Sequence, residues 1–214
     1  MSAPLPAEAP LRSESATARK QRAVLEAAGD LFLEEGFAAV SMEAVARRAG
    51  VSKATLYAYF PGKDALFGAV VARRCTMMME SSRAVADHEA PLPQVLRTLG
   101  RFWLRFLTSQ RSLSIYRTVM AEGMRFPDLA RAFYEAGPAQ GLAWTTEWIA
   151  EEQRRGRLRA EVNPHTMAVQ FFALLRGELY LQVALGLRGE PDEAEIAAAV
   201  EPMVEVLLRA FATA

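Results

Sequence analysis

The chain has 214 residues, a formal net charge of zero and a single cysteine, Cys75. Because 51% of the residues are apolar, the composition is that of a globular protein, with enough chain for one large or two small domains. A lone cysteine excludes an internal disulfide and suits a reducing compartment. The N-terminus lacks the apolar segment of a signal peptide, and no apolar run approaches the ~20 residues of a membrane helix, so we expect a cytoplasmic protein that does not enter a membrane.

Residues 1–16 contain three prolines among Ala, Ser and Glu, a composition that predicts a flexible tail. A first helix is expected from about Thr17, on the basis of apolar residues at helical spacing: Val24, Leu25, Ala28, Leu31 and Phe32. Its early turns carry Arg19, Lys20 and Arg22, although the helix dipole favours acids at an N-terminus. This mismatch suggests that the start of the helix faces phosphate.

Residues 41–63, SMEAVARRAGVSKATLYAYFPGK, predict two short helices joined by a tight turn. Ser41 and Ser52 are of a residue type favoured at helix N-caps. Gly50 stands where the first of the two helices must stop, since glycine takes positive φ without steric cost. The pattern predicts a helix-turn-helix, whose second helix lies in the DNA major groove.

The outward face of this second helix, opposite Leu56 and Phe60, combines a cation, hydroxyls and phenols. Such groups suit phosphate contacts, and a small alanine lets a helix approach a thymine methyl. The DNA-binding positions that we expect are Ser41, Arg48, Ser52, Lys53, Ala54, Thr55, Tyr57, Tyr59 and Lys63. Among them, the expected phosphate contacts are Ser41, Tyr57, Tyr59 and Lys63, and those nearer base edges are Lys53, Ala54 and Thr55. The alternative is an ordinary helical hairpin with a solvated face.

Residues 49–67, AGVSKATLYAYFPGKDALF, resemble the DNA-binding signature of TetR-family transcriptional regulators. The resemblance extends to the apolar spacing of the first helix. Tyr59 stands where histidine is common in the family and Ser41 where threonine is common, but both keep a hydrogen-bonding group. The resemblance implies a DNA-binding head over residues 17–63 and a helical ligand-binding and dimerisation domain over residues 64–214.

The rest of the chain repeats apolar residues at helical spacing and lacks the alternation of strands, so we expect an all-α fold. A long helix follows Lys63 to about residue 86, and prolines interrupt the pattern before residue 94. The last two helices are expected over residues 163–186 and 192–211, the second with a kink at Pro202.

Residues 116–138, YRTVMAEGMRFPDLARAFYEAGP, are similar to the C-terminal domain of the AefR-like subgroup of TetR regulators. Aromatic and flexible groups with few polar ones are typical of an apolar ligand cavity. The cavity residues that we expect are Trp103, Phe106, Tyr116, Met120, Phe126, Trp144, Trp148 and Phe172. Each of them alone suits simple core packing, and it is the resemblance that favours a cavity.

Apolar stripes on the last two helices predict a four-helix contact between two subunits. The residues expected in this interface are Leu174, Gly177, Leu181, Leu185, Val200, Met203 and Leu207. The alternative is that these stripes face only the protein's own core.

The chain contains no recognisable catalytic or cofactor motif. His88 and His165 have no partner at metal spacing, and no Ser-His-Asp or Cys-His arrangement occurs, so we expect no metal, no cofactor and no enzymatic activity. Four charges among the apolar helices could fix the polar end of a ligand or pair with one another: Arg117, Glu122, Arg176 and Glu178.

Together these features predict a transcriptional repressor that binds a palindromic double-stranded DNA operator as a homodimer. A small, mostly apolar effector, unidentified, is expected to release it from the operator. Two alternatives stay open: an all-α enzyme or carrier with a vestigial head, and a constitutive DNA-binding regulator without an effector.

Overall fold

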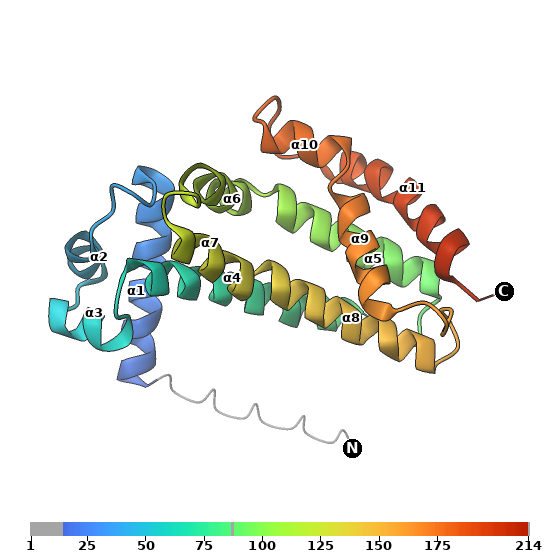
Figure 1. The fold of residues 1–214 in the computed structure, drawn as a ribbon, viewed down its shortest axis with the longest axis horizontal. Helices are drawn as coiled ribbons and strands as arrows, with labels where there is room; N and C mark the ends of the chain where they lie inside the picture. The colour runs from blue at the N-terminus through green and yellow to red at the C-terminus, as the bar shows by residue number, and fades with distance from the viewer. Residues whose placement is uncertain (1–14, 87, 214) are drawn as a thin grey trace, which may run out of the picture.

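A computed structural model describes residues 15–86 and 88–213, in which the predicted all-α architecture is confirmed. The described residues contain no β-strand apart from an isolated antiparallel bridge between Leu158 and Ala212. Three helices form the head at one end of the molecule (Figure 1): α1 (Ala16–Glu35), α2 (Met42–Ala49) and α3 (Lys53–Tyr59). The predicted tail lies outside the described residues except for Ser15, which caps α1, and Ala16, which begins it.

The remaining helices form an elongated body that extends away from the head (Figure 1). They are α4 (Lys63–Val85), α5 (Leu92–Thr108), α6 (Gln110–Glu122), α7 (Pro127–Ala136), α8 (Pro138–Arg154), α9 (Pro164–Leu175), α10 (Glu178–Ala184) and α11 (Glu193–Phe211). Helix α4 leaves the head and packs along α7, while α8 packs on α9 and α5 packs on α11. One long helix therefore links the head to the body.

The helix-turn-helix forms because its ends satisfy backbone groups locally. The Ser41 hydroxyl accepts a hydrogen bond from the Ala44 amide at 3.1 Å, and the Ser52 hydroxyl accepts one from the Thr55 amide at 3.1 Å. Gly50 takes the left-handed conformation, with φ 66° and ψ 30°, and ends α2. The caps predicted for these helices are confirmed.

Two hydrophobic clusters fill the molecule. The head core joins Val45 and Leu56 to Phe67 of α4, and it continues to Ile115 of α6 and Leu129 of α7. The body core is built by α5 and α8–α11, together with Met78 of α4 and Leu113 of α6. The head core therefore extends beyond residue 63 into α4, α6 and α7, and α4 and α6 contribute to both cores.

One of the predicted helices is wrong. Residues 163–186 form two helices rather than one, because α9 ends at Leu175 and α10 begins only at Glu178. Gly177 between them is extended, with φ −69° and ψ −160°, and acts as the N-cap of α10. The break separates the apolar residues of α9 from those of α10.

Three residues of the predicted dimer interface lie in the core of the single chain instead. Val200, Met203 and Leu207 are only 1%, 4% and 5% exposed, and they belong to the body core. Their stripe faces α5 so closely that a Cβ on Gly100 would lie 2.7 Å from Val200 Cγ1. These three residues therefore face the protein's own core, and a second subunit cannot reach them.

Candidate DNA-binding surface and ligand cavity

Helix α3 presents a polar outer face above a buried inner one. Leu56 and Phe60 are buried in the head core, whereas Lys53, Ala54 and Tyr57 are exposed. Thr55 and Tyr59 on the same helix are half-buried. The structure thus brings the residues predicted on α3 to one accessible surface whose shape is set by the helix itself.

Lys53 is held over this surface by local contacts. Its ammonium pairs with the Glu43 carboxylate and lies 5.8 Å from the centre of the Tyr57 ring. The hydrogen bond to Glu43 raises the pKa of Lys53. Because exposed ion pairs of this kind contribute little net free energy, a phosphate or a base edge can replace Glu43.

The hydroxyls of the serines at the two helix starts both accept hydrogen bonds from backbone amides. The Ser52 hydroxyl also shares a hydrogen bond of 2.8 Å with the Thr55 hydroxyl, in which either group can donate. Helix N-termini favour phosphate because their backbone N–H groups and dipole attract negative charge. The start of α2 can therefore hold a phosphate beside Ser41.

Two of the expected DNA contacts have internal partners. Arg48 donates to both oxygens of Glu34 on α1, at 3.0 and 2.8 Å. The Lys63 ammonium donates to the carbonyl oxygens of Phe37, Ala38 and Val40, at 2.6, 3.2 and 2.9 Å, so all three of its donors are used. A phosphate contact by Lys63 stays a prediction, and it would require one of these bonds to break.

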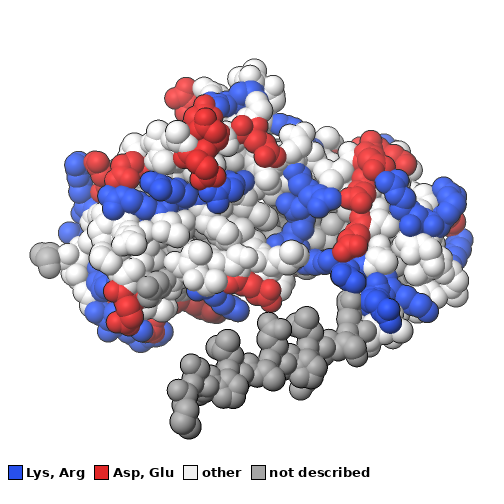
Figure 2. Space-filling view, turned by 180° about the vertical axis from the view of Figure 1, so that it is seen from behind, with Lys and Arg blue, Asp and Glu red and all other residues white. Residues whose placement is uncertain are grey.

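Positive charge gathers at the outer end of the head. Figure 2 shows Lys and Arg side chains at the right of the view, where the head lies, with a band of Asp and Glu beside them. Arg19 and Lys20 are exposed on the first turns of α1, which starts at the same end of the head as α3 (Figure 1). The position of this basic surface next to α3 suits the contact with phosphate predicted for the start of α1.

The body contains a partly open cavity of about 450 Å³ between α4–α10. Four of the predicted ligand residues line it: Trp103, Phe106, Tyr116 and Phe172. The Trp103 ring stands edge-on to Phe172 and Phe106, with centroids 4.9 and 6.0 Å apart. A volume of this size suits a small organic ligand, and aromatic walls suit a flat one.

The other four predicted ligand residues do not line the cavity. Met120 is 65% exposed, one turn beyond Tyr116 on α6. Phe126 packs with the head core, 5.7 Å from the Phe37 ring, while Trp144 and Trp148 are buried in the body core. Helical spacing shows which side of a helix faces inward, but it does not show where the interior is empty.

Helix α4 contributes wall residues that the sequence did not single out. Arg74 and Cys75 on α4 line the cavity, as do Ser112, Tyr134 and Tyr180 on other helices. Burial raises the pKa of the Cys75 thiol to about 11, so the thiol stays protonated at neutral pH. No pattern on α4 distinguishes these positions from ordinary helix residues.

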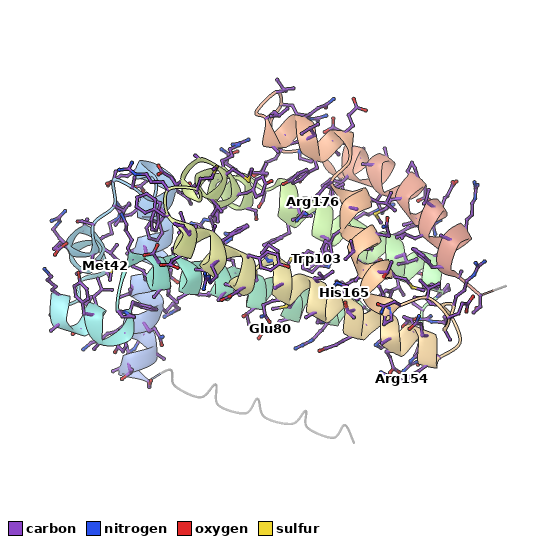
Figure 3. The ribbon with its side chains drawn as sticks, in the orientation of Figure 1. Met42, Glu80, Trp103, Arg154, His165 and Arg176 are labelled. Atoms are coloured by element: carbon purple, nitrogen blue, oxygen red, sulfur yellow. The ribbon has the colours of Figure 1, made fainter. Side chains whose placement is uncertain are left out.

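The four charges singled out among the apolar helices have different surroundings. Arg176 lines the cavity, and Figure 3 shows it close to Trp103 in the space beside α9. Arg117 instead donates to the carbonyl oxygens of Ala184 and Val183, at 2.9 and 2.6 Å. Of these four charged residues, Arg176 is the one that lines the described cavity.

An apolar surface remains uncovered on the body. Leu174, Leu181 and Leu185, all expected in the dimer interface, are 36%, 54% and 65% exposed. Gly177, also expected there, is exposed between α9 and α10. Val206 on the outer side of α11 is exposed as well.

Neither a metal site nor a membrane span appears in the described part of the chain. No group of three or more His, Cys, Asp or Glu side chains within residues 15–86 and 88–213 is placed to hold a metal ion. No helix among these residues is both long and apolar enough to cross a bilayer.

A capped helix-turn-helix joined by one long helix to a hollow helical body defines a class of DNA-binding regulators. The family model described as bacterial regulatory proteins, tetR family, matches residues 24–70, and the model of the AefR-like transcriptional repressor C-terminal domain matches residues 94–213. The chain therefore belongs to the TetR family and is a DNA-binding transcriptional regulator. Proteins of this family are transcriptional regulators and generally not enzymes.

Relatives of known name agree with this assignment. The HTH-type transcriptional regulator UidR of Escherichia coli K12 is 28% identical over 148 residues, which are 66% of this chain and 68% of UidR. A TetR-family transcriptional regulator from Mesorhizobium loti has a similar structure, with a TM-score of 0.79 and 28% identity over 94% of this chain and all of that one. The flavonoid-responsive regulator FrrA has a TM-score of 0.73 and is 38% identical, over 91% of this chain and 97% of its own.

Proposed function

We propose that this protein is a homodimeric repressor that leaves a palindromic operator when a small aromatic molecule enters its body cavity. As a regulator of genomic DNA it would act in the cytoplasm. The observation that carries the proposal is that the cavity is walled by α4, α6 and α7, the same helices that complete the head core. A ligand between these helices would therefore act directly on the packing of the head.

DNA contact is assigned to the outer face of α3 and its flanks. Lys53, Ala54 and Thr55 would meet base edges, while Tyr57 and Tyr59 would meet phosphates, because hydroxyl and ammonium groups hold the backbone and short side chains admit the helix. Ser41 and Ser52 would donate their hydroxyl protons to phosphate. Arg48 would reach phosphate only by exchanging Glu34 for it.

Dimerisation is assigned to the exposed apolar surface of α9 and α10. Leu174, Leu181 and Leu185 would bury there against the same residues of the second copy, because a two-fold axis pairs a surface with itself. Gly177 would let the two backbones approach closely. Val206 extends the surface onto α11 in place of the buried residues of that helix.

The link from the cavity to the head has identifiable contacts. A Cβ on Gly137, at the start of α8, would lie 3.2 Å from Val71 and 3.4 Å from Cys75, so α4 packs tightly against this corner of the cavity. On α6, Arg111 pairs with Asp30 of α1 at 2.8 Å. A ligand that separates α4 from α6 would change both contacts and favour a conformation with wrongly spaced heads.

The chemistry of the wall supports an aromatic effector. Trp103, Phe106, Phe172 and the wall tyrosines offer faces and edges for ring stacking. FrrA, which is flavonoid-responsive by name, gives independent support for an aromatic molecule as the effector here.

The test measures tryptophan fluorescence and operator binding with one set of aromatic compounds. All three tryptophans lie in the body, and Trp103 lines the cavity, so an effector should quench the emission. The same compound should weaken operator binding about 5–150-fold, the range of a coupling free energy of ~1–3 kcal/mol. Quenching without any change in operator affinity would point to a constitutive regulator. Failure to bind any DNA fragment of the source genome would point to a carrier or an enzyme.

A further inference from the structure

The charged groups on the cavity wall are of one sign. Two arginines, Arg74 and Arg176, line the cavity, and no Asp or Glu is among the wall residues that the structure describes. The other polar groups of the wall are the hydroxyls of Ser112 and three tyrosines and the thiol of Cys75. Hydroxyls donate readily to an anion, so nothing on the described wall opposes negative charge.

Arg74 is the more enclosed of the two cations. Its guanidinium donates to the Ser112 hydroxyl at 3.3 Å and lies 5.8 Å from the centre of the Phe106 ring. These two contacts hold the planar group in place from α6 and α5. Burial, and after it the positive charge of Arg111, lowers the pKa of Arg74.

Neighbouring arginines are neutralised, whereas Arg74 is not. Arg73 pairs with Glu26 at 3.0 Å, and Arg111 pairs with Asp30 at 2.8 Å. Among the described residues no carboxylate lies within ion-pair distance of Arg74. A half-buried charge without a counter-ion is costly, and the charge becomes favourable when an anion binds beside it.

We propose that the effector is an aromatic anion whose acid group binds the guanidinium of Arg74. The rings would lie against Trp103 and Phe172, and the ionised oxygens would accept hydrogen bonds from Arg74 and from the Ser112 hydroxyl. A guanidinium suits this role because its fork of donors matches an oxyanion. The proposal rests on the proposed function and narrows its effector to one chemical class.

The position of Arg74 also explains how such a charge would be sensed. Ser112, its partner, follows Arg111 in the first turn of α6, and Arg111 holds Asp30 of the head. An anion at Arg74 lies close to the positive charge of Arg111 as well, and it would compete with Asp30 for that charge. An acid group would therefore act on the head more strongly than a neutral group of the same size.

Two fluorescent probes with the same rings distinguish the effect of the ligand's charge from the effect of its shape. 8-Anilinonaphthalene-1-sulfonate carries an anionic group, and N-phenyl-1-naphthylamine is the same scaffold without it. Their fluorescence on binding to the full-length dimer gives a dissociation constant for each. Arg74→Gln is expected to weaken the sulfonate about 10–100-fold, the usual effect of losing a hydrogen bond to a charged group, and to leave the neutral probe unchanged.

Matched variants keep the test decisive. Arg83→Gln removes an exposed arginine near the C-terminal end of α4 and should change neither dissociation constant. Arg74→Lys keeps the positive charge but lacks the paired N–H donors of the guanidinium, so it should bind the sulfonate more tightly than Arg74→Gln and less tightly than the unaltered protein. Unchanged binding of the neutral probe shows that the variant is folded.

Either of two results would overturn the proposal. Arg74→Gln could weaken the binding of both probes equally, or it could leave the affinity for the sulfonate unchanged. In both cases the neutral probe still binds the unaltered protein, so the cavity and the proposed function survive. If neither probe binds the unaltered protein, the ligand cavity of the proposed function fails together with the proposal.

Discussion

The head and the body are packed differently around their aromatic residues. In the head, Phe32, Phe37 and Phe67 contact one another with ring centroids 5.3–5.7 Å apart, and Phe37 and Phe67 are fully buried. In the body, Trp103, Phe106 and Phe172 make similar contacts at the edge of a cavity of about 450 Å³. The aromatic residues of the head therefore pack against one another, whereas those of the body also border a cavity that the proposed effector would fill.

The largest expected effect comes from the head core. Phe37→Ala removes a ring that is only 2% exposed and should cost about 3–5 kcal/mol of unfolding free energy. Phe172→Ala should cost less, because one side of that ring already borders the cavity. Urea unfolding followed by helical circular dichroism measures both, and equal costs would contradict the contrast between a filled head and a hollow body.

The second effect concerns the proposed dimer surface of α9 and α10. If that surface pairs two subunits, Leu181→Arg should produce monomers in sedimentation, because it would place a charge in an apolar two-fold contact. Operator affinity should then fall about 100-fold or more, since the two heads no longer bind as one unit. Met124→Arg is the control, as Met124 is exposed in the loop between α6 and α7. A Leu181→Arg dimer of normal stability would place the interface elsewhere.

A smaller effect distinguishes two roles for a lysine of the head. Lys63→Met removes three hydrogen bonds to carbonyl oxygens and should lower stability by about 1–3 kcal/mol. We expect the salt dependence of operator binding to stay unchanged, because those donors are already used within the protein. If the slope of log operator affinity against log salt concentration instead falls by about one unit per half-site, Lys63 contacts phosphate. Lys53→Ala, on the exposed face of α3, should instead change which operators are preferred.

The same contrast explains what could be predicted from the chain alone. The head follows local rules: Ser41 and Ser52 cap helices, and Gly50 ends one, through contacts within four residues. The cavity depends on how α4–α10 pack, so helical spacing alone identifies four aromatic residues that line it and does not identify Arg74. The stripe containing Val200 fits α5 as well as it would fit a second subunit, because an apolar stripe does not identify its partner.

The smallest expected effect comes from the exposed ion pair that joins α2 to α1. Hydrogen bonds from Arg48 hold the pKa of Glu34 below its ordinary value of 4.5. A depressed carboxyl pKa adds stability above the unfolded value, and that stability is lost as the pH falls through the folded value. Glu34→Gln should therefore be slightly less stable than the unaltered protein at neutral pH, and thermal unfolding curves of the two should converge below pH 4.5.

The same variant frees Arg48 for DNA. If Arg48 contacts phosphate as predicted, Glu34→Gln should bind the operator slightly more tightly at neutral pH, because the guanidinium is no longer shared with a carboxylate. The gain should be larger at low salt, where phosphate contacts contribute most. A loss of operator affinity would show instead that the ion pair orients α2. Arg48 would then have a structural role in the head and would not contact DNA. Arg105→Gln is a suitable control, since it breaks a similarly exposed pair with Glu193 in the body and should leave operator binding unchanged.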